Sequence, residues 1–393
     1  MAKNMDRRQF IQGLGGAAAG LSVASRFGWP TRSLLAASPA RTLPTAPVAV
    51  AKCADYGSAV RPTLATLFDQ LGGVERLVKG KTVAIKLNLT GGAGDSLRGL
   101  PKGETYWVHP EVVGSTISLL NSAGARRIRL VESSLGRSSS LQEFMQKAGW
   151  NYRDFAGAAS DVEFEDTNYA GPSGKYVRLS VPGGGLLFPA YDVNHSYHDC
   201  DVYVSLAKLK EHATAGVTLS MKNSFGVPPV TIYGADAGID EPARVAGGSR
   251  SMLHDGDRQP SKSALPEKDP SSPRDPGYRV PRVTVDVALA RPIHLAIIDG
   301  VSTVAGGEGP WIRRCRPVHA GVLIAGTNPV TTDAVGAALM GFDPMADHGT
   351  APFEGCDSTL KLAEQAGIGT RDLKKIEVIG MPIGKARTDF RAA

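Results

Sequence analysis

The sequence predicts an α/β fold, a largely parallel (mixed) sheet flanked by helices and arranged in one lobe or two. Segments with strand and helix patterns alternate along the chain, and the strand segments are continuous apolar runs, typical of strands covered on both faces. With 393 residues, 42% of them hydrophobic and 21% charged, the chain can bury one large α/β unit or two average domains. This composition excludes a mostly disordered, collagenous or coiled-coil protein.

Each expected element follows from its local pattern. Pro110 suits the first turn of a helix that ends before Gly124, and Gly149 ends the next one. The expected strands are 48–51, 82–86, 127–131, 202–206, 295–298, 320–325 and 376–379, and the expected helices are 61–71, 110–123, 141–148, 331–340 and 358–366.

Two stretches interrupt this alternation. Residues 151–199 are irregular and contain a short expected strand at 176–181. Residues 234–280 are rich in Gly, Pro, Ser and charged side chains and have no periodicity, which indicates either a lid over a binding site or a disordered insertion. The expected organisation is a leader at 1–40, a linker at 41–47, the α/β domain at 48–385 and a tail at 386–393.

The N-terminal residues have the pattern of a twin-arginine export signal. Arg7 and Arg8 precede a weakly apolar stretch from Leu14 to Ala24, and cleavage is expected after Ala40, with Ser38 and Ala40 as the small pair, or after Ala24. The apolar stretch is too short and too rich in glycine for a stable membrane anchor. We therefore expect the twin-arginine translocation machinery to be a partner, and the mature protein to be periplasmic or otherwise extracytoplasmic.

Charge and cysteine spacing narrow the ligand classes. The net charge is +6, but residues 1–40 hold five basic residues and one acidic residue, so most of the excess lies in the leader and no nucleic-acid partner is expected. The four cysteines, at positions 53, 200, 315 and 356, share no CxxC spacing. An iron–sulfur cluster is therefore not expected, and the pairing of the cysteines stays open.

Polar residues gather where the expected strands end, which is the edge at which open parallel sheets bind ligands. Lysines attract phosphate or carboxylate groups, carboxylates hold divalent cations, and a histidine moves protons or ligates a metal. The expected ligand-binding residues are Lys86, Asn88, Ser133, Ser134, Lys208, Lys210, Lys222 and Asn223; the expected catalytic residues are His212, Glu132 and Asp299; and the candidate metal ligands are His212, Asp299, Glu308 and Asp333.

These residues predict one pocket lined by Lys86, Lys208, Lys210, His212 and Lys222. Lys208 and His212 share a face whether their segment is strand or helix. The preferred hypothesis is an exported enzyme that uses an anionic, phosphate-bearing or metal cofactor. A non-catalytic binding protein for an anionic small molecule is the alternative, and a purely structural lysine–carboxylate network is a third interpretation.

Several strings occur in the order typical of one family. They include Ile85-Lys86-Leu87-Asn88-Leu89, Leu206-Ala207-Lys208-Leu209-Lys210-Glu211-His212, Lys222-Asn223-Ser224-Phe225-Gly226 and Asn328-Pro329-Val330-Thr331-Thr332-Asp333. Over roughly 48–385 the chain resembles the family catalogued as domain of unknown function 362. The resemblance implies a fold and site positions rather than a reaction. Some relatives carry ferredoxin-type cysteine clusters, which this chain lacks.

Overall fold

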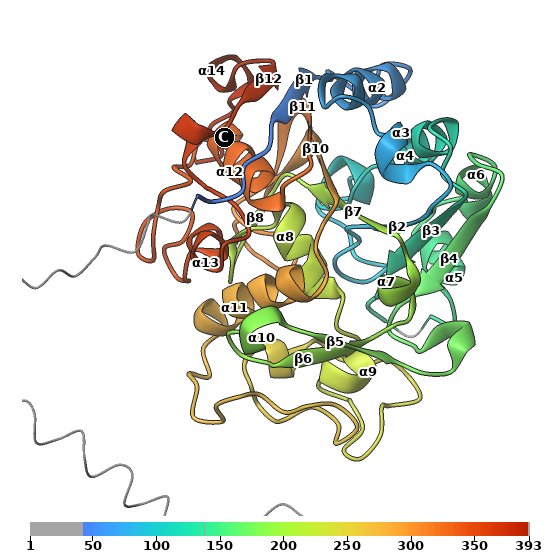
Figure 1. Ribbon diagram of the computed structural model, residues 1–393, viewed down its shortest axis with the longest axis vertical. Helices are drawn as coiled ribbons and strands as arrows, with labels where there is room; N and C mark the ends of the chain where they lie inside the picture. The colour runs from blue at the N-terminus through green and yellow to red at the C-terminus, as the bar shows by residue number, and fades with distance from the viewer. Residues whose placement is uncertain (1–41, 137, 392–393) are drawn as a thin grey trace, which may run out of the picture. The chain divides into compact units, whose positions relative to one another are not determined.

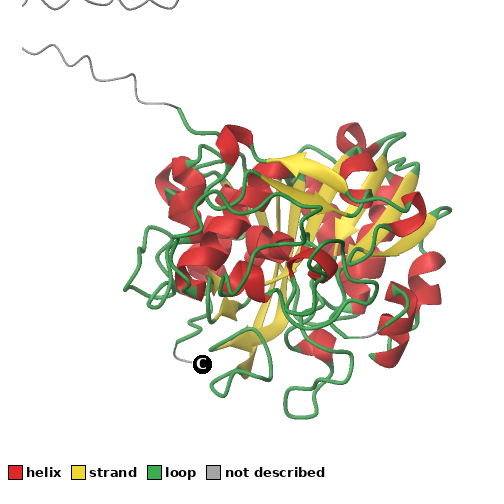
Figure 2. Ribbon diagram, turned by 90° about the horizontal axis from the view of Figure 1, so that it is seen from below, coloured by secondary structure: helices red, strands yellow, loops and turns green. Residues whose placement is uncertain are grey.

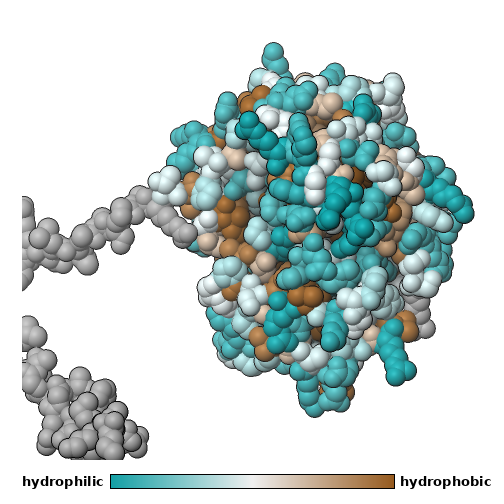
Figure 3. Space-filling view, turned by 45° about the vertical axis from the view of Figure 1, so that its right-hand side comes forward, coloured by the Kyte–Doolittle hydropathy of each residue, from teal (hydrophilic) through white to brown (hydrophobic). Residues whose placement is uncertain are grey.

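The computed structural model describes residues 42–136 and 138–391. The expected leader at 1–40 lies outside the described residues, so its export signal stays a prediction. Within the described ranges, no helix is long and apolar enough to cross a membrane. On the face drawn in Figure 3, hydrophilic side chains predominate and apolar ones form small separate patches.

The centre of the fold is an eight-stranded mixed sheet in the order β12-β1-β11-β10-β7-β2-β3-β4 (Figure 1). β11 is antiparallel to both of its neighbours, and the other neighbouring pairs are parallel. The predicted fold class is confirmed. The strands are β1 (Val48–Lys52), β2 (Thr82–Lys86), β3 (Arg127–Glu132), β4 (Val162–Asp166), β7 (Val202–Lys208), β10 (Leu295–Ala305), β11 (Arg316–Gly326) and β12 (Val378–Gly380).

Helices cover both faces of this sheet (Figure 2), because successive strand side chains point to opposite sides. Val83 and Ile85 of β2 pack in one core with the helices that precede β4, and Ala84 packs in the opposite one. The first layer contains α2 (Val60–Gln70), α4 (Pro110–Ser122), α5 (Leu141–Lys147) and α6 (Tyr152–Ala156). The second contains α8 (Leu219–Asn223), α11 (Pro276–Ala290), α12 (Pro329–Leu339), α13 (Thr359–Gln365) and α14 (Ile383–Ala386).

Short elements join these layers. Two small antiparallel pairs are β5 (Val177–Ser180) with β6 (Ala190–Val193), and β8 (Glu211–His212) with β9 (Gly216–Val217). Within the described ranges, the remaining α-helices are α3 (Glu75–Val78), α7 (Ser196–Asp199), α9 (Val230–Tyr233) and α10 (Ser251–His254). The 3-10 turns are η2 (Lys102–Glu104), η3 (Gly171–Ser173), η4 (Pro182–Gly184), η5 (Ser224–Gly226) and η6 (Leu373–Lys375).

The irregular stretch expected at 234–280 ends earlier, at Asp275. The Asp275 side chain accepts a hydrogen bond from the backbone N–H of Tyr278 and so caps α11, and Pro276 occupies the first turn. Sequence periodicity missed this helix because Pro281 lies inside it. Before it, the irregular stretch buries Met252 and Leu253 against the second layer. The stretch is therefore packed onto the domain rather than detached from it.

Candidate functional site

A cavity of about 480 Å³ lies at the carboxyl edge of β2 and β3. Its walls come from segments far apart in sequence: the loops after these two strands, the β8–β9 pair, α8 with η5, the irregular stretch, and the loop after β10. We call this cavity the edge pocket. Of the residues predicted for the site, it is lined by Lys86, Asn88, Glu132, Ser133, His212, Lys222, Asn223 and Glu308.

A neutralised ion pair lies at one wall of the edge pocket. Lys86 and Glu132 end the neighbouring strands β2 and β3, so their side chains meet, and both are almost fully buried. Glu132 also accepts hydrogen bonds from the backbone N–H groups of Leu89 and Ser133, each at 2.9 Å. Burial lowers the pKa of Lys86 from its usual value, and Glu132 opposes that shift. This pair offers little net charge to a ligand.

Lys222, on α8, has a different environment. Its side chain is only 8% exposed, and its Nζ lies 4.1 Å from the centre of the Phe225 ring. Among the described residues, no hydrogen bond or ion pair reaches this Nζ. Burial, aided by the positive charge of Arg250, lowers the pKa of Lys222 to about 7, although Glu308 acts in the opposite direction. Lys222 is thus a basic group that lines a cavity and has no hydrogen-bond or ion-pair partner among the described residues.

The position of α8 depends on Asp333 of α12. Its buried carboxylate accepts hydrogen bonds from the backbone N–H groups of Ser220 and Met221, at 2.8 and 2.9 Å, and from the Ser220 hydroxyl at 2.6 Å. Burial raises the pKa of Asp333 to about 7. Asp333 therefore fixes the helix that carries Lys222 and does not line the pocket.

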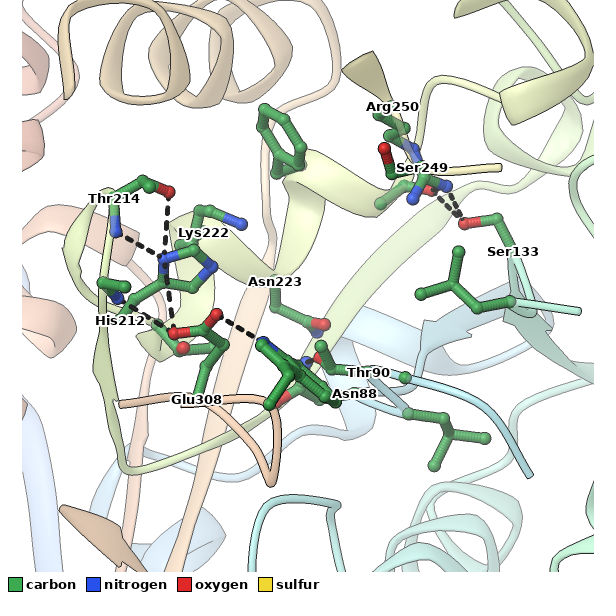
Figure 4. Close-up of a pocket in the computed structure, with 18 of the residues that line it drawn as sticks. Asn88, Thr90, Ser133, His212, Thr214, Lys222, Asn223, Ser249, Arg250 and Glu308 are labelled. Carbon is green, nitrogen blue, oxygen red and sulfur yellow. Dashed lines mark hydrogen bonds and ion pairs between the residues drawn. The ribbon is translucent and has the colours of Figure 1, made fainter. Parts of the chain in front are cut away.

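His212 is held in one orientation beside Lys222. Its Nδ1 accepts a hydrogen bond from the backbone N–H of Thr214 at 3.2 Å and lies 4.0 Å from Glu308 Oε2, which leaves the proton of the neutral ring on Nε2. Figure 4 shows Nδ1 facing Thr214 and Glu308, with the other ring nitrogen turned away from them. Burial, and then the charge of Lys222, place the pKa of His212 well below its usual value.

Glu308 and Trp311 close the pocket on the side of β10. Glu308 accepts hydrogen bonds from the backbone N–H of Ala213 at 2.9 Å and from Trp311 Nε1 at 2.8 Å. Burial alone would raise its pKa, but the His212 ring and these donors lower it to about 2. The Trp311 ring packs on Gly91, where a Cβ would lie 2.5 Å from a ring atom. The glycine after Thr90 is therefore needed for this close approach.

Arg250 joins the irregular stretch to the pocket. Its Nε donates to the carbonyl of Pro228 at 2.7 Å, and its Nη2 donates to the carbonyl of Gly226 at 3.1 Å and to the Ser133 hydroxyl. His254 lies one turn further along, and burial, followed by the charge of Lys222, lowers its pKa to about 4. Sequence reasoning missed both residues, because a stretch without periodicity gives no indication of which side chains turn inward.

Several oxygens at the pocket are buried without a hydrogen-bond partner. Within the described ranges these are Asn88 Oδ1, Thr218 Oγ1 and Asn223 Oδ1, on side chains that are at most 5% exposed. The amide of Asn223 is oriented by its Nδ2, which donates to Ser205 Oγ at 3.0 Å and to the carbonyl of Lys86 at 3.2 Å. Unpaired buried acceptors are costly, so the site favours a ligand that supplies N–H or O–H groups.

The expectation that Lys208 and Lys210 line the pocket is wrong. Lys208 Nζ is fully buried and bonds to Asp299 Oδ2 at 2.9 Å, the Tyr56 hydroxyl at 2.9 Å and the Gly103 carbonyl at 2.7 Å. Lys210 Nζ bonds to the carbonyl of Tyr106 at 2.6 Å. Lys208 and His212 also separate, because β7 ends at Lys208 and the chain then turns into the β8–β9 pair.

The remaining candidates also lie away from the pocket. Ser134 donates to Asp166, and Asp299 belongs to the Lys208 cluster. Of the four candidate metal ligands, only His212 and Glu308 come together, and the described ranges contain no group of three or more His, Cys, Asp or Glu placed to hold a metal ion. All four cysteines are free and buried.

Comparison with known proteins gives a family but no activity. A thylakoid-associated protein of Synechocystis sp. is 29% identical over 168 residues, which cover 42% of this chain and 46% of that protein. The alignment thus spans less than half of the relative's length. The model of the family described as "Domain of unknown function (DUF362)" matches residues 83–338, which is more than half of the chain. The chain therefore belongs to the DUF362 family.

Proposed function

We propose that this chain is an enzyme that acts on an anionic small molecule bound in the edge pocket. The observation that carries the proposal is Lys222, a buried basic group that faces a cavity and has no hydrogen-bond or ion-pair partner among the described residues. Removing a cation from water without a counter-charge is unfavourable. A carboxylate or phosphate in the pocket would supply that counter-charge and favour the protonated lysine.

Arg250 supports the same ligand class from another wall. Its Nε and Nη2 are bonded to protein oxygens, whereas no hydrogen bond within the described ranges occupies its Nη1. Arginine nitrogens bind carboxylate and phosphate oxygens with strong, charge-assisted hydrogen bonds. The unpartnered oxygens of Asn88 and Asn223 would accept hydrogen bonds from hydroxyl or amine groups elsewhere on the ligand.

His212 makes an enzyme a better interpretation than a passive binding protein. The contact with Thr214 directs its Nδ1 away from the ligand, and the neutral ring then carries its proton on Nε2, where it can donate a hydrogen bond that polarises a bound carbonyl or phosphate group. A binding protein requires no such proton donor beside its cation. The proposal does not require a metal ion, since the charged groups at the pocket are organised around lysine and arginine.

Equilibrium binding of defined anions tests this proposal. The probes are inorganic phosphate, glycerol 3-phosphate and 4-hydroxypentanoate, with tryptophan fluorescence and calorimetry as readouts because Trp311 lines the pocket. We expect Lys222→Met to weaken binding by roughly 10- to 100-fold, the value of a charge-assisted hydrogen bond. Lys79→Met, at a side chain that is 71% exposed, is the control and should bind as wild type does. Equal affinity of wild type and Lys222→Met for every probe would contradict the proposal.

We also propose that the protein reaches an extracytoplasmic compartment through the twin-arginine translocation machinery. The support is the Arg7-Arg8 pair and the weakly apolar residues that follow it. Replacing both arginines with lysine should leave the precursor in the cytoplasm, as measured by fractionation and immunoblotting. Normal export of that variant would contradict the proposed route and leave the pocket proposal unaffected.

A further inference from the structure

The surroundings of Lys222 suit a nucleophile as well as a cation. A lysine amine attacks carbonyl compounds when it is removed from water and placed near other positive groups. Lys222 meets both conditions, because it lies in a cavity wall, packs on Phe225, and has Arg250 close enough to lower its pKa. By contrast, Lys86 and Lys208 have carboxylate partners, which favour the unreactive ammonium form.

We propose that Lys222 forms an imine with an aldehyde or ketone that carries a carboxylate or phosphate several bonds from its carbonyl group. Figure 4 shows Lys222 and Arg250 on opposite sides of the edge pocket. A ligand whose carbonyl group reaches Lys222 and whose anionic group reaches Arg250 must therefore carry these two groups several bonds apart. The inference rests on the proposed function, because it takes the bound anion and the reactive carbonyl to be parts of one ligand.

The chemical step balances without any further reactant. The lone pair of the neutral Lys222 amine attacks the carbonyl carbon, the carbonyl oxygen gains a proton, and the nitrogen loses one, which gives a carbinolamine. The hydroxyl group then leaves as water after a second protonation, and the C=N bond forms. The neutral His212 ring can assist by donating a hydrogen bond from Nε2–H to the carbonyl oxygen, since its Nδ1 is held by Thr214 and its Nε2 is free of protein hydrogen bonds within the described ranges. The proton that the nitrogen loses and the proton that the leaving hydroxyl gains are exchanged with solvent water.

The groups around Lys222 also favour the neutral amine. Arg250, Lys210 and Lys86 oppose a charge on Lys222, burial acts in the same direction, and Glu308 acts against them. The two neighbouring imidazoles, His212 and His254, are uncharged at neutral pH because their own pKa values are lowered. With its pKa lowered to about 7 in the free protein, a large fraction of Lys222 is nucleophilic at neutral pH before a ligand binds, whereas an ordinary lysine remains almost entirely protonated. An anion held by Arg250 on the opposite wall would raise this pKa less than an anion in direct contact with Lys222.

Reductive trapping tests this inference with 4-oxopentanoate, a ketone whose carboxylate is separated from its carbonyl. The full chain is incubated with the probe and sodium cyanoborohydride, which reduces an imine to a stable secondary amine, and labelled peptides are mapped by mass spectrometry. We expect about one label per chain, at Lys222, and at least tenfold less label at the exposed Lys79. Pyruvate, whose carboxylate adjoins its carbonyl, should label Lys222 more slowly because it cannot reach both walls.

Matched controls separate the two proposals. Lys222→Arg keeps a cation but cannot form an imine, so it should lose the label, whereas Lys79→Arg should keep it. The non-carbonyl analogue 4-hydroxypentanoate reports binding alone. If this analogue binds and 4-oxopentanoate leaves no label at Lys222, the imine is contradicted and the proposed function stands. If wild type binds neither of these compounds nor the two phosphate probes, both proposals are contradicted. Equal labelling of Lys222 and Lys79 would also overturn the inference. This comparison is made on the wild-type chain, so it does not depend on whether a variant folds.

Discussion

Lys208 and Lys222 are both buried, yet the protein surrounds them differently. The Nζ of Lys208 is held by a carboxylate, a phenol and a backbone carbonyl, and neither it nor Asp299 is exposed to solvent. The Nζ of Lys222 lies over the Phe225 ring and makes no hydrogen bond or ion pair among the described residues, and its side chain lines a cavity. The same residue type therefore serves the fold in one place and remains available to a ligand in the other.

The difference shows that the presence or absence of a carboxylate partner indicates whether a buried lysine stabilises the fold or is available to a ligand. Lys86 lies between the two cases, since it lines the edge pocket but is neutralised by Glu132. Replacing these lysines one at a time should accordingly separate loss of stability from loss of binding.

The largest effect is expected for Lys208→Met. This change leaves the Asp299 carboxylate buried without its counter-charge and should lower the free energy of unfolding by about 3–5 kcal/mol. Urea denaturation followed by circular dichroism measures the loss, and Lys222→Met is the matched comparison. Equal destabilisation by the two substitutions would remove the distinction between the two lysines.

A smaller, pH-dependent effect is expected for Lys222→Met. Because the pKa of Lys222 is lowered to about 7 in the folded chain, the unfolded chain binds more protons between that pH and the ordinary value of 10.5. The free energy of unfolding of wild type therefore rises with pH across this window. Below the window, the full cost of burying a protonated Lys222 is present. Relative to wild type, Lys222→Met should gain roughly 3–4 kcal/mol as the pH falls from 10 to 7. A difference that stays constant with pH would show that Lys222 titrates normally.

The smallest effect is expected for Ser133→Ala. The Ser133 hydroxyl donates to the Gly226 carbonyl and accepts from Arg250, and so connects the loop after β3 to the irregular stretch. Its loss should cost about 1 kcal/mol and increase hydrogen exchange around residues 249–254. Unchanged exchange there would mean that Ser133 does not help to hold Arg250 at the pocket.

Most of the fold could be predicted from the sequence because buried parallel strands are continuous apolar runs. β2 begins and ends where expected, and β3 and β7 extend the expected segments by one and two residues. The helix α11 was not predicted, because its internal proline, Pro281, is untypical of a helix in sequence. Short elements such as α8 depend on tertiary contacts, including the cap by Asp333, which local sequence does not reveal.

Of the residues at the site, only those at the ends of adjacent strands could be predicted from the sequence. Lys86 and Glu132 end adjacent parallel strands, so the topology alone brings them to one edge. Lys208 also ends a strand, but its direction depends on Tyr56 and Asp299, which come from distant segments. Arg250 arrives from a long irregular stretch, and no periodic pattern could assign it to the pocket.

The central claim is that Lys222 has no counter-charge in the free protein and gains one when an anion binds in the edge pocket. Titration of Lys222 by nuclear magnetic resonance tests this claim most directly. Lysine labelled with ¹³C at Cε is incorporated, and the Lys222 signal is assigned with Lys222→Arg. We predict a pKa near 7 in the free protein, because burial disfavours the charge. On addition of 4-hydroxypentanoate the pKa should rise, because the bound carboxylate stabilises the ammonium form. An ordinary lysine pKa that the anion does not change would contradict the account.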